Sequence, residues 1–369
     1  MDETLQDAQA ARTAPRGVMG AGYGRHAEAQ RAGADAALDL LDRAVAAVAA
    51  APVGGAAPVK DPRRFRLADL GCADGANSLS PMHRAVSGLR RAHEGADVLV
   101  THTDIPGNDF NALFERLAGP GSHTALPGVY AAARCGSFYN RLFAAAEIDL
   151  AWSSIAVHWL SRLPGPLTGH IYGPSTSGPV RAALARRARE DWHAFLRHRA
   201  VELAPGGQLV VVGGAAAEDG SSGAEGIMDM AAAELETMLR RGLLSEDTWA
   251  EMAIPTWNRT ESEYLEAFTT PGVGGLLTLE ESDFLALPDA AYERFLRNGD
   301  PEAYGQEVAA SFLVAFGPSL FGSGARHVAE RFETGLAERV RRDPEAAETH
   351  WRIRLIRATR TDAPSPRPA

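Results

Sequence analysis

Lysine is nearly absent from this chain. Lys60 is the only lysine in 369 residues, so arginine supplies the other basic side chains, and the formal net charge is −10. Nucleic acids are bound mainly through clustered cations that neutralise phosphates, and the acidic balance therefore argues against a nucleic-acid partner. A single lysine in an alanine-rich chain is also typical of a GC-rich bacterial genome.

Cysteines and long apolar runs are scarce as well. Cys72 and Cys135 are the only cysteines, and so few in a long chain suit a reducing compartment better than a disulfide framework. The sequence contains no run of about 18 apolar residues and no apolar segment of the signal-peptide type. We expect a cytoplasmic protein without a membrane segment, with disordered tails at residues 1–17 and 361–369.

The chain also lacks the residue spacings that are typical of metal-binding motifs and of common catalytic triads. Its 11 histidines are scattered, and His193 and His198 stand five residues apart, which places them on different faces of a helix. No H-E-x-x-H motif, cysteine cluster or Ser-His-Asp set accompanies the motifs below. We therefore predict no metal ion.

The first half of the chain alternates strand patterns with helix patterns, after a helical region at about 27–50. Such an alternation implies a parallel sheet with helices on both faces, which is an α/β fold. The strand segments are 65–70, 98–103, 129–134, 148–153 and 208–212, and the helical segments are 76–92, 108–118 and 179–203.

The pattern changes after Gly214, where helices follow one another without strands between them. We interpret residues from about 220 to 300 as a mostly helical cap over the C-terminal edge of the sheet. Residues 18–219, together with about 300–360, then form the α/β core. The helical segments are 226–243, 245–253, 261–268, 301–316 and 324–342, and the last strand covers 350–359.

The first strand ends in a glycine-containing loop, ADLGCADGANSL, at residues 68–79. Asp69 precedes Gly71 and Gly75, which let the backbone approach a ligand closely. A phosphate-binding P-loop needs a lysine here, and a dinucleotide site needs G-x-G-x-x-G; the loop has neither. S-adenosylmethionine carries no phosphate, and a tight turn followed by an acid on the next strand suits it better.

Asp104 is the candidate for that acid, because it ends the second strand in the segment DIPGNDFNALF. Its two oxygens can accept hydrogen bonds from both ribose hydroxyls, while Ile105 lies along the adenine. Asn108 or Asp109 is positioned to cap the following helix. The alternative, which the pattern alone leaves open, is that Asp104 only stabilises a turn.

Four motifs, in order, resemble the SABATH methyltransferases: DLGCADGANSL, DIPGNDFNALFERL, GSFYNRLF (136–143) and SSIAVHWLSRLP (153–164). The resemblance extends over roughly residues 18 to 360. It implies a Rossmann-like class I methyltransferase sheet, S-adenosyl-L-methionine as cofactor, and methylation of a carboxyl group of a small acid or of a ring nitrogen. Family members are commonly homodimers, so the resemblance implies a homodimer here too.

The resemblance also implies roles for single residues in the cofactor site. Ser137 and Phe138 would contact the adenine, and Ser153 would lie near the sulfonium. Tyr23 matches a tyrosine of the family pattern. Two positions depart from the family pattern, since His26 and Ala27 replace an asparagine and a serine. The implied cofactor residues are Tyr23, Asp69, Gly71, Cys72, Asn77, Asp104, Ile105, Ser137, Phe138 and Ser153.

The implied substrate site centres on Gln30 and Trp159, whose side-chain N–H groups would orient the substrate carboxylate. A carboxylate is already ionised at pH 7 and needs no general base, so two neutral donors fit this chemistry. Without the resemblance, His158 and Trp159 are equally well explained as packed core. The remaining implied substrate-binding residues are His158, Ile155 (commonly tyrosine in the family), Trp257 and Phe312.

Three other functions compete with a carboxyl methyltransferase. The same fold methylates heteroaromatic nitrogens, but Gln30 and Trp159 suit a carboxylate. A nicotinamide oxidoreductase is disfavoured by the glycine spacing, and a non-catalytic binding protein by the intact site residues. Magnesium is not expected, because Ala250 and Ala253 stand where some family members have polar ligands.

Overall fold

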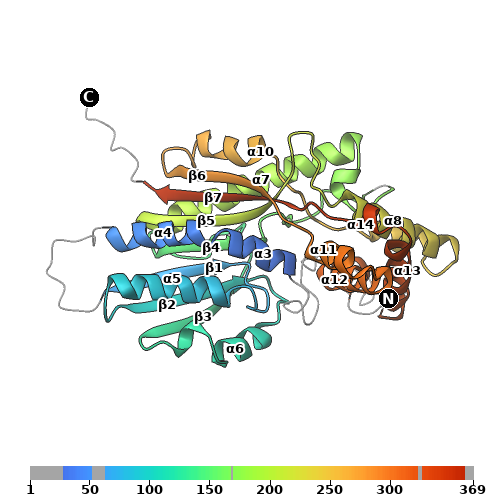
Figure 1. Cartoon of the computed structure of the whole chain (residues 1–369). Coiled ribbons are helices and arrows are strands. Elements are labelled where there is room, and N and C mark those ends of the chain that lie inside the picture. The colour runs from blue at the N-terminus through green and yellow to red at the C-terminus, as the bar shows by residue number, and fades with distance from the viewer. Residues whose placement is uncertain (1–27, 52–62, 168, 323–325, 362–369) are drawn as a thin grey trace, which may run out of the picture.

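The computed structural model describes residues 28–51, 63–167, 169–322 and 326–361. Within these residues a seven-stranded sheet has the order β3-β2-β1-β4-β5-β7-β6 (Figure 1). Strands β1 to β5 run parallel, and β7 is antiparallel to both β5 and β6. The strands are β1 (Arg64–Leu70), β2 (Asp97–Asp104), β3 (Val129–Cys135), β4 (Ile148–Ser154), β5 (Leu203–Ala215), β6 (Leu277–Ala286) and β7 (Arg352–Arg360).

Helices cover both faces of the sheet, which confirms the predicted α/β class. Leu41 and Met82 belong to the apolar cluster on one face, under α4 (Leu38–Ala50) and α5 (Leu79–Ala92). Trp192 and Phe195 of α7 (Gly178–Glu202) belong to the cluster on the other face. The helix expected over 27–50 is interrupted at Ala37, so α3 (Glu28–Ala36) is a separate helix that precedes α4.

A further group of helices gathers at one end of the sheet, on the right of Figure 1. They share one hydrophobic cluster, in which Met228, Phe312 and Phe332 are buried. They are α8 (Glu225–Arg240), α9 (Glu246–Glu251), α11 (Ala290–Asn298), α12 (Pro301–Phe321), α13 (Arg326–Arg342) and α14 (Pro344–Ala347). We call this group of helices the cap.

The cap differs from the predicted one in two respects. Helices α12 and α13 pack with α8 in the cap cluster, although the sequence placed residues beyond about 300 with the core. Residues 277–286 form strand β6, where only helices were expected. β6 carries Glu280, Glu281 and Asp283, and acidic residues are uncommon in strands. Its hydrogen bonding to β7, and not its own strand propensity, therefore makes this segment a strand. The expected tails lie outside the described residues, apart from Thr361.

The strand order positions the ligand site. The chain proceeds outward from β1 to β2 and β3, then crosses back to β4 beside β1. In such sheets the crevice at the C-terminal ends of the two strands, where the order reverses, is where ligands bind. The loops after β1, β2, β3 and β4 all meet there.

A buried ion pair fixes the loop after β3 to helix α7. Arg199 and Glu202 near the end of α7 are each 1% exposed and lie 2.7 Å apart. Arg199 donates to the carbonyls of Phe138 and Asn140, and Glu202 accepts from the backbone N–H of Phe143 at 3.0 Å. The loop after β3 is therefore held in place by two charged side chains that are buried away from water.

We expect Arg199→Met to lower the free energy of unfolding by about 3–5 kcal/mol, because Glu202 would remain buried without its partner. Urea denaturation measures this loss. Arg197→Met on the exposed side of the same helix is the matched control and should change stability by about 0.5 kcal/mol or less. Equal midpoints for the two variants would show that the pair contributes nothing.

Candidate functional site

The loop after β1 has the backbone geometry that its glycines suggested. Gly71 has φ +82°, and a Cβ there would come within 2.6 Å of the Cβ of Ala156. The N–H groups of Gly71 and Cys72 both donate to the carbonyl of Thr103 on β2. Gly71 is therefore required by its conformation and by the close approach of the chain after β4.

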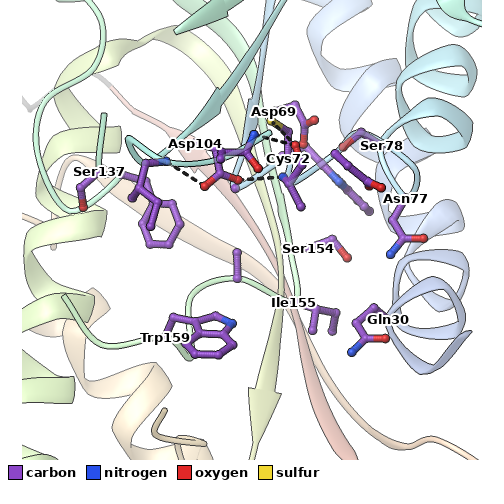
Figure 2. Close-up of a pocket in the computed structure, with 18 of the residues that line it drawn as sticks. Gln30, Asp69, Cys72, Asn77, Ser78, Asp104, Ser137, Ser154, Ile155 and Trp159 are labelled. Atoms are coloured by element: carbon purple, nitrogen blue, oxygen red, sulfur yellow. Dashed lines mark hydrogen bonds between the residues drawn. The ribbon is translucent and has the colours of Figure 1, made fainter. Parts of the chain in front are cut away.

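Asp104 joins the loops after β1 and β2. Its carboxylate accepts from the N–H of Ala73 and from the N–H of Ile105, each at 2.7 Å (dashed in Figure 2). Burial raises the pKa of Asp104 to about 6, although the two N–H donors favour the ionised form. Each oxygen keeps a further acceptor site. Asp104 thus stabilises a turn, as the alternative supposed, and also lines the cavity at this edge.

Aromatic rings form the neighbouring wall, in the loop after β3. Phe138 packs edge-on against Tyr139, with ring centroids 4.7 Å apart, and its ring lies beside Gly71. Ser137 lines the same cavity and accepts from the N–H of Tyr139. The hydroxyl of Tyr139 lies 2.6 Å from the carbonyl of Trp159, to which it donates, so this wall is tied to the loop after β4.

Two polar atoms in the cavity have no hydrogen-bond partner among the described residues. They are the side-chain oxygens of Asn77 and Ser154, and both atoms are buried. Ser153, the residue implied by the resemblance, points elsewhere, because its hydroxyl donates to the carbonyl of Leu70 at 2.9 Å. Side chains alternate along a strand, so Ser154 and not Ser153 faces the cavity.

The two cysteines are free. Cys72 is buried in the cavity wall, and its burial, together with the charges of Asp69 and Asp104, raises the pKa of the thiol well above its usual range. It therefore stays protonated, as a small apolar side chain would.

Gln30 and Trp159 lie at the opposite end of the cavity from Asp104 and Ser137 (Figure 2). Neither side chain has a hydrogen-bond partner among the described residues, and both line the cavity. Ile155 lies between them with φ +51°, a conformation that is strained for a β-branched residue. Its side chain packs against Gly33 of α3, where a Cβ would come within 2.9 Å of Ile155 Cδ1. Gly33 therefore lets α3, and with it Gln30, approach the site.

Gln30 also lines a second cavity, which lies between α3 and the cap and is called the cap cavity below. Its walls are mainly apolar, and His158 and Phe312 belong to them. Trp257 does not line either cavity, because it packs in another cluster and its indole N–H points to Glu263. Neither cavity has an arginine or lysine among its described lining residues. Tyr23, like His26 and Ala27, lies outside the described residues.

Comparison with known proteins decides the family. The family model described as SAM dependent carboxyl methyltransferase matches residues 11–358. The chain belongs to this family, the SABATH methyltransferases. S-adenosylmethionine is accordingly its cofactor.

The curated SABATH relatives act on different acceptors. Over 237 residues the chain is 30% identical to "Probable 7-methylxanthine methyltransferase 3" of Theobroma cacao, covering 60% of this chain and 64% of the relative. It is 32% identical over 213 residues to the salicylate carboxymethyltransferase of Clarkia breweri, covering 54% and 58%. The match thus spans about three fifths of these relatives.

A solved structure has the same fold along its whole length. The loganic acid methyltransferase with SAH superimposes with a TM-score of 0.77 at 20% identity, covering 93% of this chain and 99% of that one. This agreement confirms the predicted class I methyltransferase sheet. Among the described residues, no helix combines the length and the apolar character that crossing a bilayer requires.

The cavity fits the SABATH cofactor. A bound S-adenosylmethionine needs acceptors for its ribose hydroxyls and its ammonium group, and Asp104, Asp69 and the unpaired oxygen of Asn77 are all in the wall. Buried polar atoms are nearly always paired, so Asn77 and Ser154 indicate that a ligand completes the site. Sequence reasoning missed Ser154, whose role depends on which face of β4 its side chain occupies. It also missed Tyr139, whose role depends on a contact between two loops.

We expect the affinity for S-adenosylhomocysteine to fall as the pH decreases through about 6, because protonated Asp104 accepts fewer hydrogen bonds. The raised pKa means that the native state binds this proton more tightly, so acid does not destabilise the fold through Asp104. Asp104→Asn should bind more weakly by about 1.5–3 kcal/mol at pH 7.5 and show no step near pH 6.

Calorimetry at several pH values measures both effects. Asp109→Asn is the matched control, because Asp109 caps α6 (Phe110–Ala118) through Ala112 and lies outside the cavity. If Asp104→Asn binds S-adenosylhomocysteine as the wild type does, Asp104 serves the turn alone.

Proposed function

We propose that this SABATH enzyme transfers a methyl group to the carboxylate of a small-molecule acid and produces a methyl ester. The observation that carries the proposal is the pair Gln30 and Trp159. Both side chains offer N–H donors that have no hydrogen-bond partner within the described part of the chain, and Gln30 borders both the cofactor cavity and the cap cavity. The salicylate and indole-3-acetate relatives methylate acids, which supports this assignment.

Neutral donors are suited to this reaction. S-adenosylmethionine supplies an electrophilic methyl group, and a carboxylate oxygen is the nucleophile without further activation. A guanidinium or ammonium clamp would bind the anion more strongly but would reduce its nucleophilicity. Gln30 and Trp159 would hold one oxygen and leave the other free to react, so that proximity and exclusion of water provide the rate acceleration.

The cap cavity suits an apolar remainder of the acid, aromatic or aliphatic. Its carboxylates are already engaged, so they would not repel the substrate strongly. Glu28 and Glu307 both pair with Arg294, and Asp289 accepts from the N–H of Tyr292. The apolar wall residues include Ala29, Ala32, Ile227, Met228, Leu287, Val308, Phe312, Phe316 and Trp351.

Methylation of a ring nitrogen is the second candidate, because methylxanthine methyltransferases are among the relatives. A ring N–H must lose its proton before or during transfer, and His158 is the one histidine in the described wall of the cap cavity. Burial lowers the pKa of His158 to about 3, so it is a weak proton acceptor. The carboxylate, which needs no base, therefore fits the site better.

We further propose a cytoplasmic homodimer. Light scattering that gives the monomer mass of 39.2 kDa at micromolar concentration would rule out the dimer.

The deciding experiment is a screen of aromatic and fatty acids, with 7-methylxanthine alongside, using cofactor labelled in the methyl group. Esters are extracted and identified by mass. We expect methyl esters from at least one class of acid and no methylated xanthine. Calorimetry with S-adenosylhomocysteine and NADH should show binding of the former only. Methylated xanthine without any ester would refute the carboxyl assignment.

Trp159→Phe should reduce kcat as well as raise KM on the best acid, because a carboxylate that is held less well reaches the methyl group less often. The ring is largely retained, so the fold should survive. Trp257→Phe is the matched control, since it also removes an indole N–H but lies outside both cavities. Equal kcat/KM for Trp159→Phe and wild type would show that the indole only packs.

Gln30→Leu should behave like Trp159→Phe, and the double variant should lose less than the sum of the two losses, because both donors serve one carboxylate. Gln306→Leu on the exposed side of α12 controls for loss of an amide. Affinity for S-adenosylhomocysteine should stay nearly constant in all of these variants. Full additivity would indicate that the two donors act on different groups.

A further inference from the structure

A chain of three buried side chains lies behind the cofactor cavity. Asp69 Oδ2 is 2.8 Å from His102 Nδ1, and His102 Nε2 is 3.4 Å from His123 Nε2. Asp69 is 2% exposed and both histidines are fully buried. None of this follows from the SABATH motifs, in which only Asp69 was assigned a role.

Strand register brings the first two residues together. Asp69 of β1 and His102 of β2 are direct partners in the parallel ladder, so their side chains emerge on the same face. His123 approaches from the other side, in the short helix η1 (His123–Ala125), and its ring centroid is 5.3 Å from that of His102. His102 is thus held between a carboxylate and a second imidazole.

The positions of the hydrogens follow from chemistry. A carboxylate only accepts, so His102 Nδ1 carries the hydrogen that lies between it and Asp69. Burial lowers the pKa of His123 to about 4, which keeps this ring neutral. If His123 donates from Nε2 to His102 Nε2, then its Nδ1 is a bare nitrogen, and Nδ1 indeed has no partner among the described residues.

Asp69 is the carboxylate that remains for the ammonium group of the cofactor. Three carboxylates line the described part of the cofactor cavity, namely Asp69, Asp74 and Asp104. Asp74 forms an ion pair with Arg116 at 2.9 Å, and Asp104 is placed for the ribose. Asp69 uses one oxygen for His102, and no bond to its second oxygen is found among the described residues.

We propose that His102, supported by His123, is a positioning residue that orients the carboxylate of Asp69 toward the ammonium group of the cofactor. A buried polar group needs a hydrogen-bond partner, and Asp69 is only 2% exposed. His102 is that partner and donates from a fixed direction, because its other nitrogen is held by His123. This inference rests on cofactor binding and not on the identity of the methyl acceptor.

A metal ion is the rival explanation, since ligand atoms of Asp69, Cys72 and His102 all lie within 4.8 Å of one another. Zinc binding would require the thiolate of Cys72, and the raised pKa of this thiol disfavours that form. The hydrogen bond from His102 Nδ1 also occupies the atom that would bind the ion. The hydrogen-bonded arrangement accounts for the cluster without an ion.

The test compares two ligands that differ at the amino-acid end. S-adenosylhomocysteine has the ammonium group, and 5′-methylthioadenosine lacks it but keeps the adenine and ribose. We expect His102→Leu to weaken binding of S-adenosylhomocysteine about tenfold to a hundredfold by calorimetry, with binding of 5′-methylthioadenosine unchanged. His102→Asn, which keeps a donor near Nδ1, should recover most of the loss.

Three controls keep the test decisive. His83→Leu on α5, outside the cavity, should bind both ligands normally. His123→Leu should cause a smaller loss in the same direction, and it replaces His102→Leu if that variant does not fold. ¹⁵N NMR of the wild type should show the hydrogen of His102 on Nδ1.

Other results would overturn the proposal. If His102→Leu weakens both ligands equally, or neither, His102 does not act through Asp69 on the ammonium group. Stoichiometric zinc that the purified wild type retains and His102→Asn loses would identify a metal site instead. A screen without any ester product would leave these binding results unaffected, so the two proposals fail separately.

Discussion

The cofactor cavity depends on one carboxylate that accepts hydrogen bonds from two backbone N–H groups. Asp104 accepts from Ala73 in the loop after β1 and from Ile105 in its own loop, so the ends of two adjacent strands share one anchor. Gly71 and Gly75 are needed because that loop must turn back toward β2 with positive φ. The cavity wall, the start of α5 and the position of Asn77 all follow from this turn.

The candidate site consists of two neighbouring cavities, which have Gln30 in common. The cofactor cavity is built mainly by the loops that follow the strands, and the cap cavity by α3, by cap helices and by loop residues such as His158 and Trp351. Gln30 borders both, and α3 can bring it there only because Gly33 has no side chain to collide with Ile155. The strained backbone of Ile155 thus lies in the wall of the cofactor cavity beside Gln30, and such strain often occurs at functional sites.

Two buried charged groups near the site have side-chain partners that fix the loops around it. Arg199 and Glu202 hold the loop that carries Ser137 and Phe138, and His102 faces Asp69 behind the cofactor loop. The cavities themselves lack arginine and lysine among their described residues, which suits a reaction in which the nucleophile must keep its charge. Charge therefore supports the structure around the site, and neutral donors face the proposed substrate.

Local pattern was enough to predict the alternating strands and helices, the loop from Gly71 to Asn77, and Asp104, because period and turn chemistry depend on neighbouring residues. Tertiary structure decided the rest. The alternation of side chains along β4 places Ser154, and not Ser153, in the cavity wall. Trp257 packs in a separate hydrophobic cluster, away from the site. Pairing with β7 made a strand of the acidic segment 277–286. Register between β1 and β2 joined Asp69 to His102, a contact across 33 residues that no local pattern encodes.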